Sequence, residues 1–135
     1  MSKKVLLSIL NKNVSNTLID TLDIKFVDVG EDFLVASMPV NPKVYQPDKI
    51  LHGGATAALA ETVGSAASSI LLKKGNKIVR GIELSINHLK SVRSGVIFAK
   101  AKAVHSGRTM QLWNIKITND NDEIISIAKL TTLTL

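Results

Sequence analysis

Cysteine is absent from the 135-residue sequence, and aromatic residues make up only 4% of it. Without cysteine the chain has no disulfide framework and no thiol chemistry. With so few aromatic rings, a base-stacking platform for nucleic acid is poorly supplied. The three histidines, His52, His88 and His105, lack the spacing of zinc ligands. We therefore expect no metal, no other cofactor and no nucleic-acid partner.

Acidic residues are also in short supply. Lysine and arginine number 17 against 11 aspartate and glutamate residues, which gives a net charge of +6. Nucleic-acid binding is one interpretation of this surplus, but the basic residues are scattered apart from Lys3-Lys4 and Lys73-Lys74. A phosphorylated small molecule would suit a basic surface equally well.

Uninterrupted hydrophobic runs are short. The basic pair near the N-terminus precedes too few apolar residues for a signal peptide. Residues 53–72 have the length of a membrane span, but Glu61 at their centre would cost about 2.5–3.5 kcal/mol in a bilayer. We expect a buried helix in a cytoplasmic protein. Because 45% of this short chain is hydrophobic, we also expect part of its apolar surface to lie in a subunit interface.

Periodicity predicts the order of the elements. Apolar residues at helical spacing fill residues 5–22, with a break near Asn13, and residues 23–40 alternate as two strands around a turn at 30–32. Residues 50–72 form one long helix, buried on most faces, with Gly75 as its C-cap. Four strands follow at 77–89, 95–105, 109–119 and 123–135. This order predicts a single α+β domain over residues 1–135, a curved antiparallel sheet wrapped around a long central helix, with a helix at the N-terminus.

The long helix begins with His-Gly-Gly and carries a single acid, Glu61. Free backbone N–H groups at Gly53 and the positive end of the helix dipole suit a developing oxyanion. A loop-to-helix turn that requires glycine is the structural alternative. Small residues surround Glu61 and no other charge follows before Lys73. We expect a desolvated catalytic carboxylate rather than a solvated or lysine-paired acid.

Polar residues accompany this pair. The amide of Gln46, on the loop that enters the helix, can donate to a carbonyl oxygen. Ser65 lies four residues after Glu61, so both project from one helix face. Taken singly, Gln46 and His52 are polar loop residues that could simply satisfy backbone groups.

The stretch QPDKILHGGATAALAETVGS (residues 46–65) resembles the active-site segment of the hotdog-fold acyl-CoA thioesterases. The similarity is to the branch with the 4-hydroxybenzoyl-CoA, aryl-CoA and hydroxynaphthoyl-CoA thioesterases, and it runs from Leu22 to the C-terminus. It implies that the Gly53 N–H and Gln46 bind the thioester carbonyl and that His52 helps to position it. Glu61 would attack the carbonyl carbon or activate water. Ser65 would contact the acyl group or that water.

The resemblance also implies that His88 lines the acyl pocket and that active sites are shared between the subunits of a homodimer or homotetramer. The long pantetheine arm of CoA must leave the site, so we expect its phosphates to meet Lys90, Arg93 and Arg108, which follow strand ends. A non-catalytic acyl-CoA-binding domain is the main alternative. A hotdog dehydratase is another, although that chemistry usually needs a histidine paired with the acid.

Overall fold

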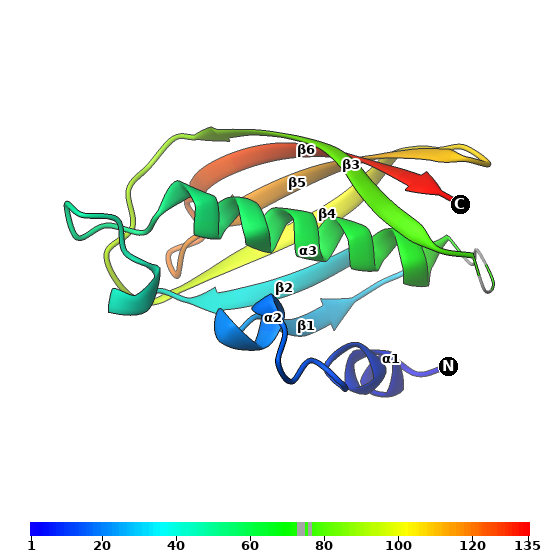
Figure 1. Ribbon diagram of the computed structural model, residues 1–135, viewed down its shortest axis with the longest axis horizontal. Coiled ribbons are helices and arrows are strands. Elements are labelled where there is room, and N and C mark those ends of the chain that lie inside the picture. The colour runs from blue at the N-terminus through cyan, green and yellow to red at the C-terminus, as the bar shows by residue number, and fades with distance from the viewer. Residues whose placement is uncertain (73–74, 76) are drawn as a thin grey trace.

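One long helix lies across one face of a curved six-stranded antiparallel sheet (Figure 1). The computed structural model describes residues 1–72, 75 and 77–135. The sheet has the order β1-β2-β4-β5-β6-β3. Its strands are β1 (Lys25–Val29), β2 (Phe33–Pro39), β3 (Val79–His88), β4 (Val96–Ser106), β5 (Met110–Thr118) and β6 (Ile124–Thr134). The helices are α1 (Lys3–Leu10), α2 (Leu18–Thr21), α3 (Gly53–Leu71) and the short 3₁₀ helix η1 (Pro42–Val44). The α+β hotdog architecture predicted from the sequence is confirmed.

The sheet holds α3 by one stripe of the helix only. The buried residues of α3 are Thr56, Leu59, Ala60, Val63, Gly64, Ala67 and Ser68. A Cβ on Gly64 would lie 2.5 Å from Leu130 Cδ2, so glycine permits the close approach of α3 to β6. The opposite side of α3, which carries Ala57 and Glu61, is half-buried or exposed. The expectation of a helix buried on most faces is therefore wrong for the single chain, because the sheet covers only one side.

A polar network lies under the C-terminal half of α3. The Ser68 hydroxyl is 2.7 Å from Thr132 Oγ1, 3.2 Å from Gln111 Oε1, and accepts from Trp113 Nε1 at 3.2 Å. Ser68, Gln111, Trp113 and Thr132 are all fully buried. Satisfied polar groups in a low-dielectric core require a specific geometry, so this network fixes the rotation of α3 about its axis.

The strand after α3 does not pair with the strand that follows it in sequence. β3 runs to the far edge of the sheet and pairs with β6, with His88 opposite Ser126. Figure 1 shows β3 passing beside α3 on its way along that edge. The consequence is that the end of β3 arrives at the beginning of α3.

The predicted break in the N-terminal helical segment is confirmed, whereas the predicted end of the long helix is wrong. The N-terminal helical segment is broken as expected, and Ser2 and Thr17 cap α1 and α2. The long helix ends at Leu71 with Leu72 at the C-cap, so Gly75 is not its C-cap. Lys73 and Lys74 lie outside the described residues. Within those residues, no helix is long and apolar enough to cross a membrane.

Candidate active site

Backbone hydrogen bonds fix the loop that leads into α3. The Leu51 N–H donates to the Val92 carbonyl and the His52 N–H to the Val44 carbonyl, each at 2.8 Å. Before them the chain makes a tight turn in which the Gln46 N–H donates to the Ile50 carbonyl at 2.9 Å. The first turn of α3 is therefore anchored to the segment after β3, and the residues around it have defined positions.

His52 is the N-cap of α3. Its Nδ1 accepts from the Gly54 N–H at 2.7 Å. This bond turns the imidazole toward its own helix and satisfies one of the free amides at the helix start. No acceptor for the neighbouring Gly53 N–H exists within residues 1–72, 75 and 77–135. The cap thus leaves Gly53 as a backbone donor at the positive end of the helix dipole.

His88 closes over Gly53 from the end of β3. A Cβ on Gly53 would lie only 2.8 Å from His88 Nε2, so any larger residue here would displace the exposed His88 ring. The other ring nitrogen, Nδ1, is 2.9 Å from the hydroxyl of Ser126. A pocket of about 290 Å³ lies here, lined by Gln46, Gly53, Thr56, His88, Lys90 and Ser126 among others. The fold therefore brings together Gln46, Gly53 and His88, three residues that the sequence predicted.

Gln46 is oriented by a residue to which the sequence assigned no role. Its Nε2 donates to Asp48 Oδ1 at 2.8 Å. A glutamine amide has two donor hydrogens, so this bond uses one and leaves the second for another acceptor. Asp48 is exposed, but it lies only two residues along the turn that Gln46 begins, and that short separation is what brings the two side chains together.

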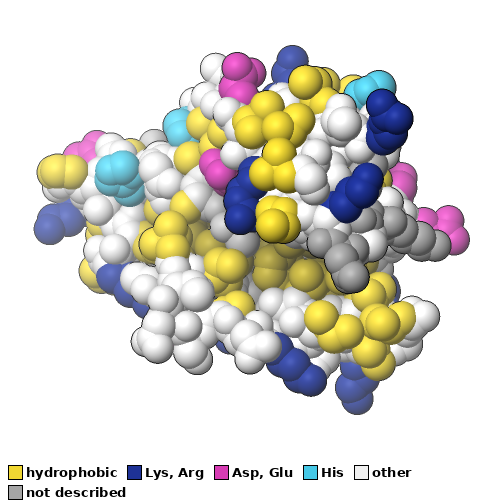
Figure 2. Space-filling model, turned by 45° about the vertical axis from the view of Figure 1, so that its right-hand side comes forward, with side chains coloured by type: hydrophobic (Ala, Val, Ile, Leu, Met, Phe, Trp, Pro, Cys, Tyr) yellow, Lys and Arg dark blue, Asp and Glu magenta, His cyan; other side chains and the backbone are white. Residues whose placement is uncertain are grey.

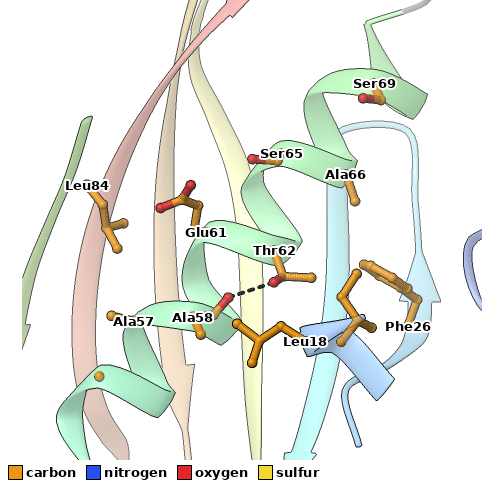
Figure 3. Close-up of a pocket in the computed structure, with 12 residues that line it drawn as sticks. Leu18, Phe26, Ala57, Ala58, Glu61, Thr62, Ser65, Ala66, Ser69 and Leu84 are labelled. Atoms are coloured by element: carbon orange, nitrogen blue, oxygen red, sulfur yellow. Dashed lines mark hydrogen bonds between the residues drawn. The ribbon is translucent and has the colours of Figure 1, made fainter. Parts of the chain in front are cut away.

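Glu61 and Ser65 lie in a different cavity. Both line a hollow of about 600 Å³ with Ala57, Leu84 and residues of α2. Figure 3 shows the Glu61 and Ser65 side chains on the β3 side of α3, whereas Thr62 and Ala66 point toward Leu18 and Phe26. Figure 2 shows hydrophobic side chains gathered in a hollow with lysine and arginine side chains beside it.

β3 packs close to this acid without enclosing it. A Cβ on Gly81 would lie 3.1 Å from Glu61 Oε2 and 3.3 Å from Ser65 Oγ. Glu61 is nevertheless exposed in the single chain, and its carboxylate has no hydrogen bond or ion pair with any described residue. The expectation of a desolvated carboxylate is wrong for one chain by itself, since one side of α3 is left uncovered.

The two cavities are too far apart to act on one carbonyl group within a chain. Glu61 follows Gly53 by eight residues, which corresponds to roughly 12 Å along a helix at 1.5 Å per residue. A thioester carbonyl bound to the Gly53 N–H is therefore out of reach of Glu61 from the same chain.

The basic residues expected near the site fall into two groups. Lys90 and Arg93 lie in the segment after β3, and the Lys90 ammonium pairs with Glu123. The hydrogen bond from Lys90 lowers the pKa of the Glu123 carboxyl below its ordinary value. Arg93 precedes β4, whereas Arg108 lies in the β4–β5 turn at the other end of that strand (Figure 1). A strand of this length spans roughly 33 Å, which separates Arg108 from Arg93. One chain does not bring Arg108 together with Arg93.

Two residues of this region had no sequence signal that pointed to them. Asp48 is an ordinary turn residue by type. Ser126 faces the core with Ala128 and Leu130 by the ordinary alternation of β6, but a serine in a strand gives no signal that its hydroxyl contacts a distant histidine.

Comparison with known proteins agrees with this geometry. The Thioesterase superfamily model matches residues 48–126. The 1,4-dihydroxy-2-naphthoyl-CoA hydrolase of Escherichia coli is 36% identical over 133 residues, which cover 98% of this chain and 97% of that protein. The proofreading thioesterase EntH of Cronobacter turicensis is 37% identical over 126 residues, 93% of this chain and 91% of that one. The crystal structure of thioesterase HI1161 from Haemophilus influenzae matches with a TM-score of 0.91 at 40% identity, and covers 96% of this chain and 90% of that one. The chain belongs to the thioesterase superfamily, has the hotdog fold and is a thioester hydrolase.

Proposed function

We propose that the protein hydrolyses the thioester of an aromatic or medium-chain acyl-CoA to the free acid and CoA. The observation that carries this proposal is the unpartnered Gly53 N–H, which lies beside Gln46 and His88 in one pocket. Backbone and side-chain donors aimed at one point stabilise the negative charge that develops on a carbonyl oxygen. The naphthoyl-CoA activity in the name of the Escherichia coli relative supports an aromatic acyl group.

Glu61 supplies the attacking group in this proposal. In one route its carboxylate attacks the thioester carbon, the C–S bond breaks, and the CoA thiolate leaves and takes up a proton. Water then hydrolyses the acyl–Glu61 anhydride. In the other route Glu61 removes a proton from water, whose oxygen attacks the same carbon. Both routes convert one thioester and one water into one acid and one thiol, and both need Glu61 next to the carbonyl carbon.

The attacking group comes from a second copy of the chain. Gly53 and Glu61 of one chain are roughly 12 Å apart, so a complete site needs Gly53 of one subunit and Glu61 of the partner subunit. A two-fold dimer creates two such sites at once, because every contact in it occurs twice. The open side of α3 would become covered in that dimer, which would also desolvate Glu61. Pairing of two dimers into a homotetramer and a cytoplasmic location remain predictions from the sequence.

A non-catalytic acyl-CoA-binding domain was the main alternative from the sequence, and the relatives named as thioesterases argue against it. The carbonyl-binding pocket would serve such a domain equally well, but binding alone gives no role to an acid positioned to reach the electrophilic carbon. The dehydratase interpretation has less support, because the relatives that match the chain over most of its length are named as thioesterases and CoA-thioester hydrolases.

The experiment is a panel of aromatic, medium-chain and long-chain acyl-CoA thioesters with a thiol reagent that reports CoA release. We expect turnover with at least one class and none above background from the Glu61→Ala variant. Glu31→Ala, which removes an exposed acid from the β1–β2 turn, is the matched control and should retain activity. Tight binding without CoA release across the whole panel would favour the binding domain instead.

A further inference from the structure

A bulge in β6 lies directly beside Ser126, near the start of α3. Ile117 and Thr118 of β5 pair with Ser126 and Ile124, so Ile125 is an extra residue on β6. Bulges of this kind redirect side chains next to active sites. Ser126 faces inward by the ordinary alternation of β6, with Ala128 and Leu130, and the bulge adds Ile125 to the buried residues beside it. Ile125 and Ser126 are each 1% exposed.

The bulge is tied to the end of β3. The carbonyl of Ile125 accepts from the Leu89 N–H at 2.7 Å and from the Lys90 N–H at 3.2 Å. The hydroxyl of the next residue, Ser126, forms a hydrogen bond of 2.9 Å with His88 Nδ1. Ser126 on β6 and His88 on β3 are also directly opposite each other in the strand pairing. Position 126 is therefore fixed relative to the His88 ring by backbone and side chain together.

The ring that Ser126 contacts has its second nitrogen at the carbonyl-binding pocket. His88 Nε2 lies next to Gly53, within 2.8 Å of the point where a Cβ would be. In a neutral imidazole one nitrogen carries the hydrogen and the other accepts. The partner of Nδ1 therefore decides whether Nε2 offers a donor or a lone pair to the pocket.

We propose that Ser126 is a positioning residue for thioester hydrolysis. Its hydroxyl donates to His88 Nδ1, which places the ring hydrogen on Nε2 and holds that N–H beside the Gly53 N–H as a further donor to the thioester carbonyl oxygen. The proposed effect of Ser126 passes through the orientation and tautomer of His88. This role rests on the proposed function, because the acceptor of the Nε2 hydrogen is the substrate carbonyl.

The first test is independent of activity. Nitrogen NMR of the imidazoles distinguishes a hydrogen on Nε2 from one on Nδ1, and a His88→Gln variant identifies the His88 signals among the three histidines of the chain. We expect the neutral ring of the wild type to carry its hydrogen on Nε2, and the Ser126→Ala variant to lose that preference. A ring protonated on Nδ1 in the wild type would overturn the proposal, whether or not the protein hydrolyses the chosen substrate.

The second test is kinetic. Loss of the hydrogen bond in Ser126→Ala should lower kcat about tenfold with KM little changed, and Ser126→Thr, which keeps the hydroxyl, should restore most of it. In a His88→Ala background the same Ser126→Ala change should have no further effect. Ser85→Ala, an exposed hydroxyl on β3, is the control.

Additive losses in the double variant would assign Ser126 a structural role and overturn the proposal. Thermal unfolding of each variant separates loss of fold from loss of positioning. If Ser126→Ala fails to fold, the comparison of Ser126→Thr with wild type by NMR still decides the tautomer.

Discussion

The first turn and the middle of α3 are built in opposite ways. At the first turn, His52 caps the helix, Asp48 holds Gln46, and Ser126 holds His88, all within hydrogen-bond distance. Two turns further along, Glu61 is exposed, makes no hydrogen bond or ion pair within the described part of the chain, and faces a wide hollow. One chain thus completes the surroundings of the pocket around Gly53, where we propose that the carbonyl binds, but leaves Glu61 open.

Under the proposed function, this difference separates the residues that one chain holds in place from the acid that a second subunit would have to cover. Preorganised donors need fixed partners to stabilise developing charge, and the chain supplies those partners itself. A reactive carboxylate needs removal from water and a substrate within reach, and neither is present at Glu61 until another surface covers α3. Changes to the protein test the contrast between the fixed first turn of α3 and the open surroundings of Glu61.

The largest effect is expected from the acid. Glu61→Ala should lower kcat by about a thousandfold, because the group that attacks or activates water is lost. Stability should change little, since an exposed side chain without partners contributes little to folding. Steady-state kinetics and thermal unfolding measure the two effects. Near wild-type turnover in the purified variant would contradict the role of Glu61.

The next largest effect is a recovery of activity in a mixed dimer. One copy carries Glu61→Ala and the other carries Gln46→Ala with Gly53→Pro, which removes the backbone donor at a helix position that tolerates proline. Each variant alone should be inactive. A heterodimer purified through two different tags should regain about half of the wild-type turnover, because one of its two sites has all its parts.

Sites contained in one chain would give no recovery in that heterodimer. The matched control is a heterodimer of wild type with Glu61→Ala, which should also retain one working site. Sedimentation of each species confirms that dimers are being compared, and an active monomer would contradict the shared site directly.

A smaller effect distinguishes two glycines of the same helix. Gly53→Ala pushes against His88 Nε2 and should lower kcat about a hundredfold by displacing the carbonyl, with little loss of stability because the ring is exposed. Gly64→Ala meets Leu130 at 2.5 Å and Ile115 at 3.0 Å in the core. It should instead destabilise the fold by about 1–3 kcal/mol. Kinetics and denaturant unfolding on both variants check the contrast, and a loss of stability in Gly53→Ala equal to that in Gly64→Ala would remove it.

The smallest effect concerns the CoA phosphates. Arg93 has no ion-pair partner within the described residues, whereas Lys90 is paired with Glu123. Arg93→Ala should raise KM for acyl-CoA about threefold with kcat unchanged, and Lys90→Ala should have less effect. Neither should change KM for an acyl-pantetheine, which lacks the nucleotide. Arg108 lies at the other end of the sheet, so its substitution should matter only if a second subunit brings it to the nucleotide. Equal losses on the truncated substrate would exclude the phosphate role.

Several parts of the fold and the site could be predicted from local sequence patterns. Helical spacing, alternation and turn residues gave the elements and their order, because these signals depend on neighbours in the chain. Most of the candidate site residues also lie within one short segment, residues 46–65, which forms one loop and one helix. The resemblance of this segment to the thioesterases implied that Gln46 and Gly53 act on one carbonyl group, and both line the same pocket. Contacts between distant strands leave no such local signal, which is why β3 beside β6 and the partner of His88 were not predicted.

The sequence by itself determined that α3 begins close to the His-Gly-Gly motif and that a single acid follows Gly53 by eight residues on the same helix. Helix geometry then fixes the separation of Gly53 and Glu61, since both lie on one rigid element. Only the tertiary structure decided that β3 crosses to the far edge, that Ser126 lies opposite His88, and that Glu61 remains exposed. Each of these depends on which distant surfaces pack together, because burial belongs to the whole fold and not to a residue or its neighbours in the chain.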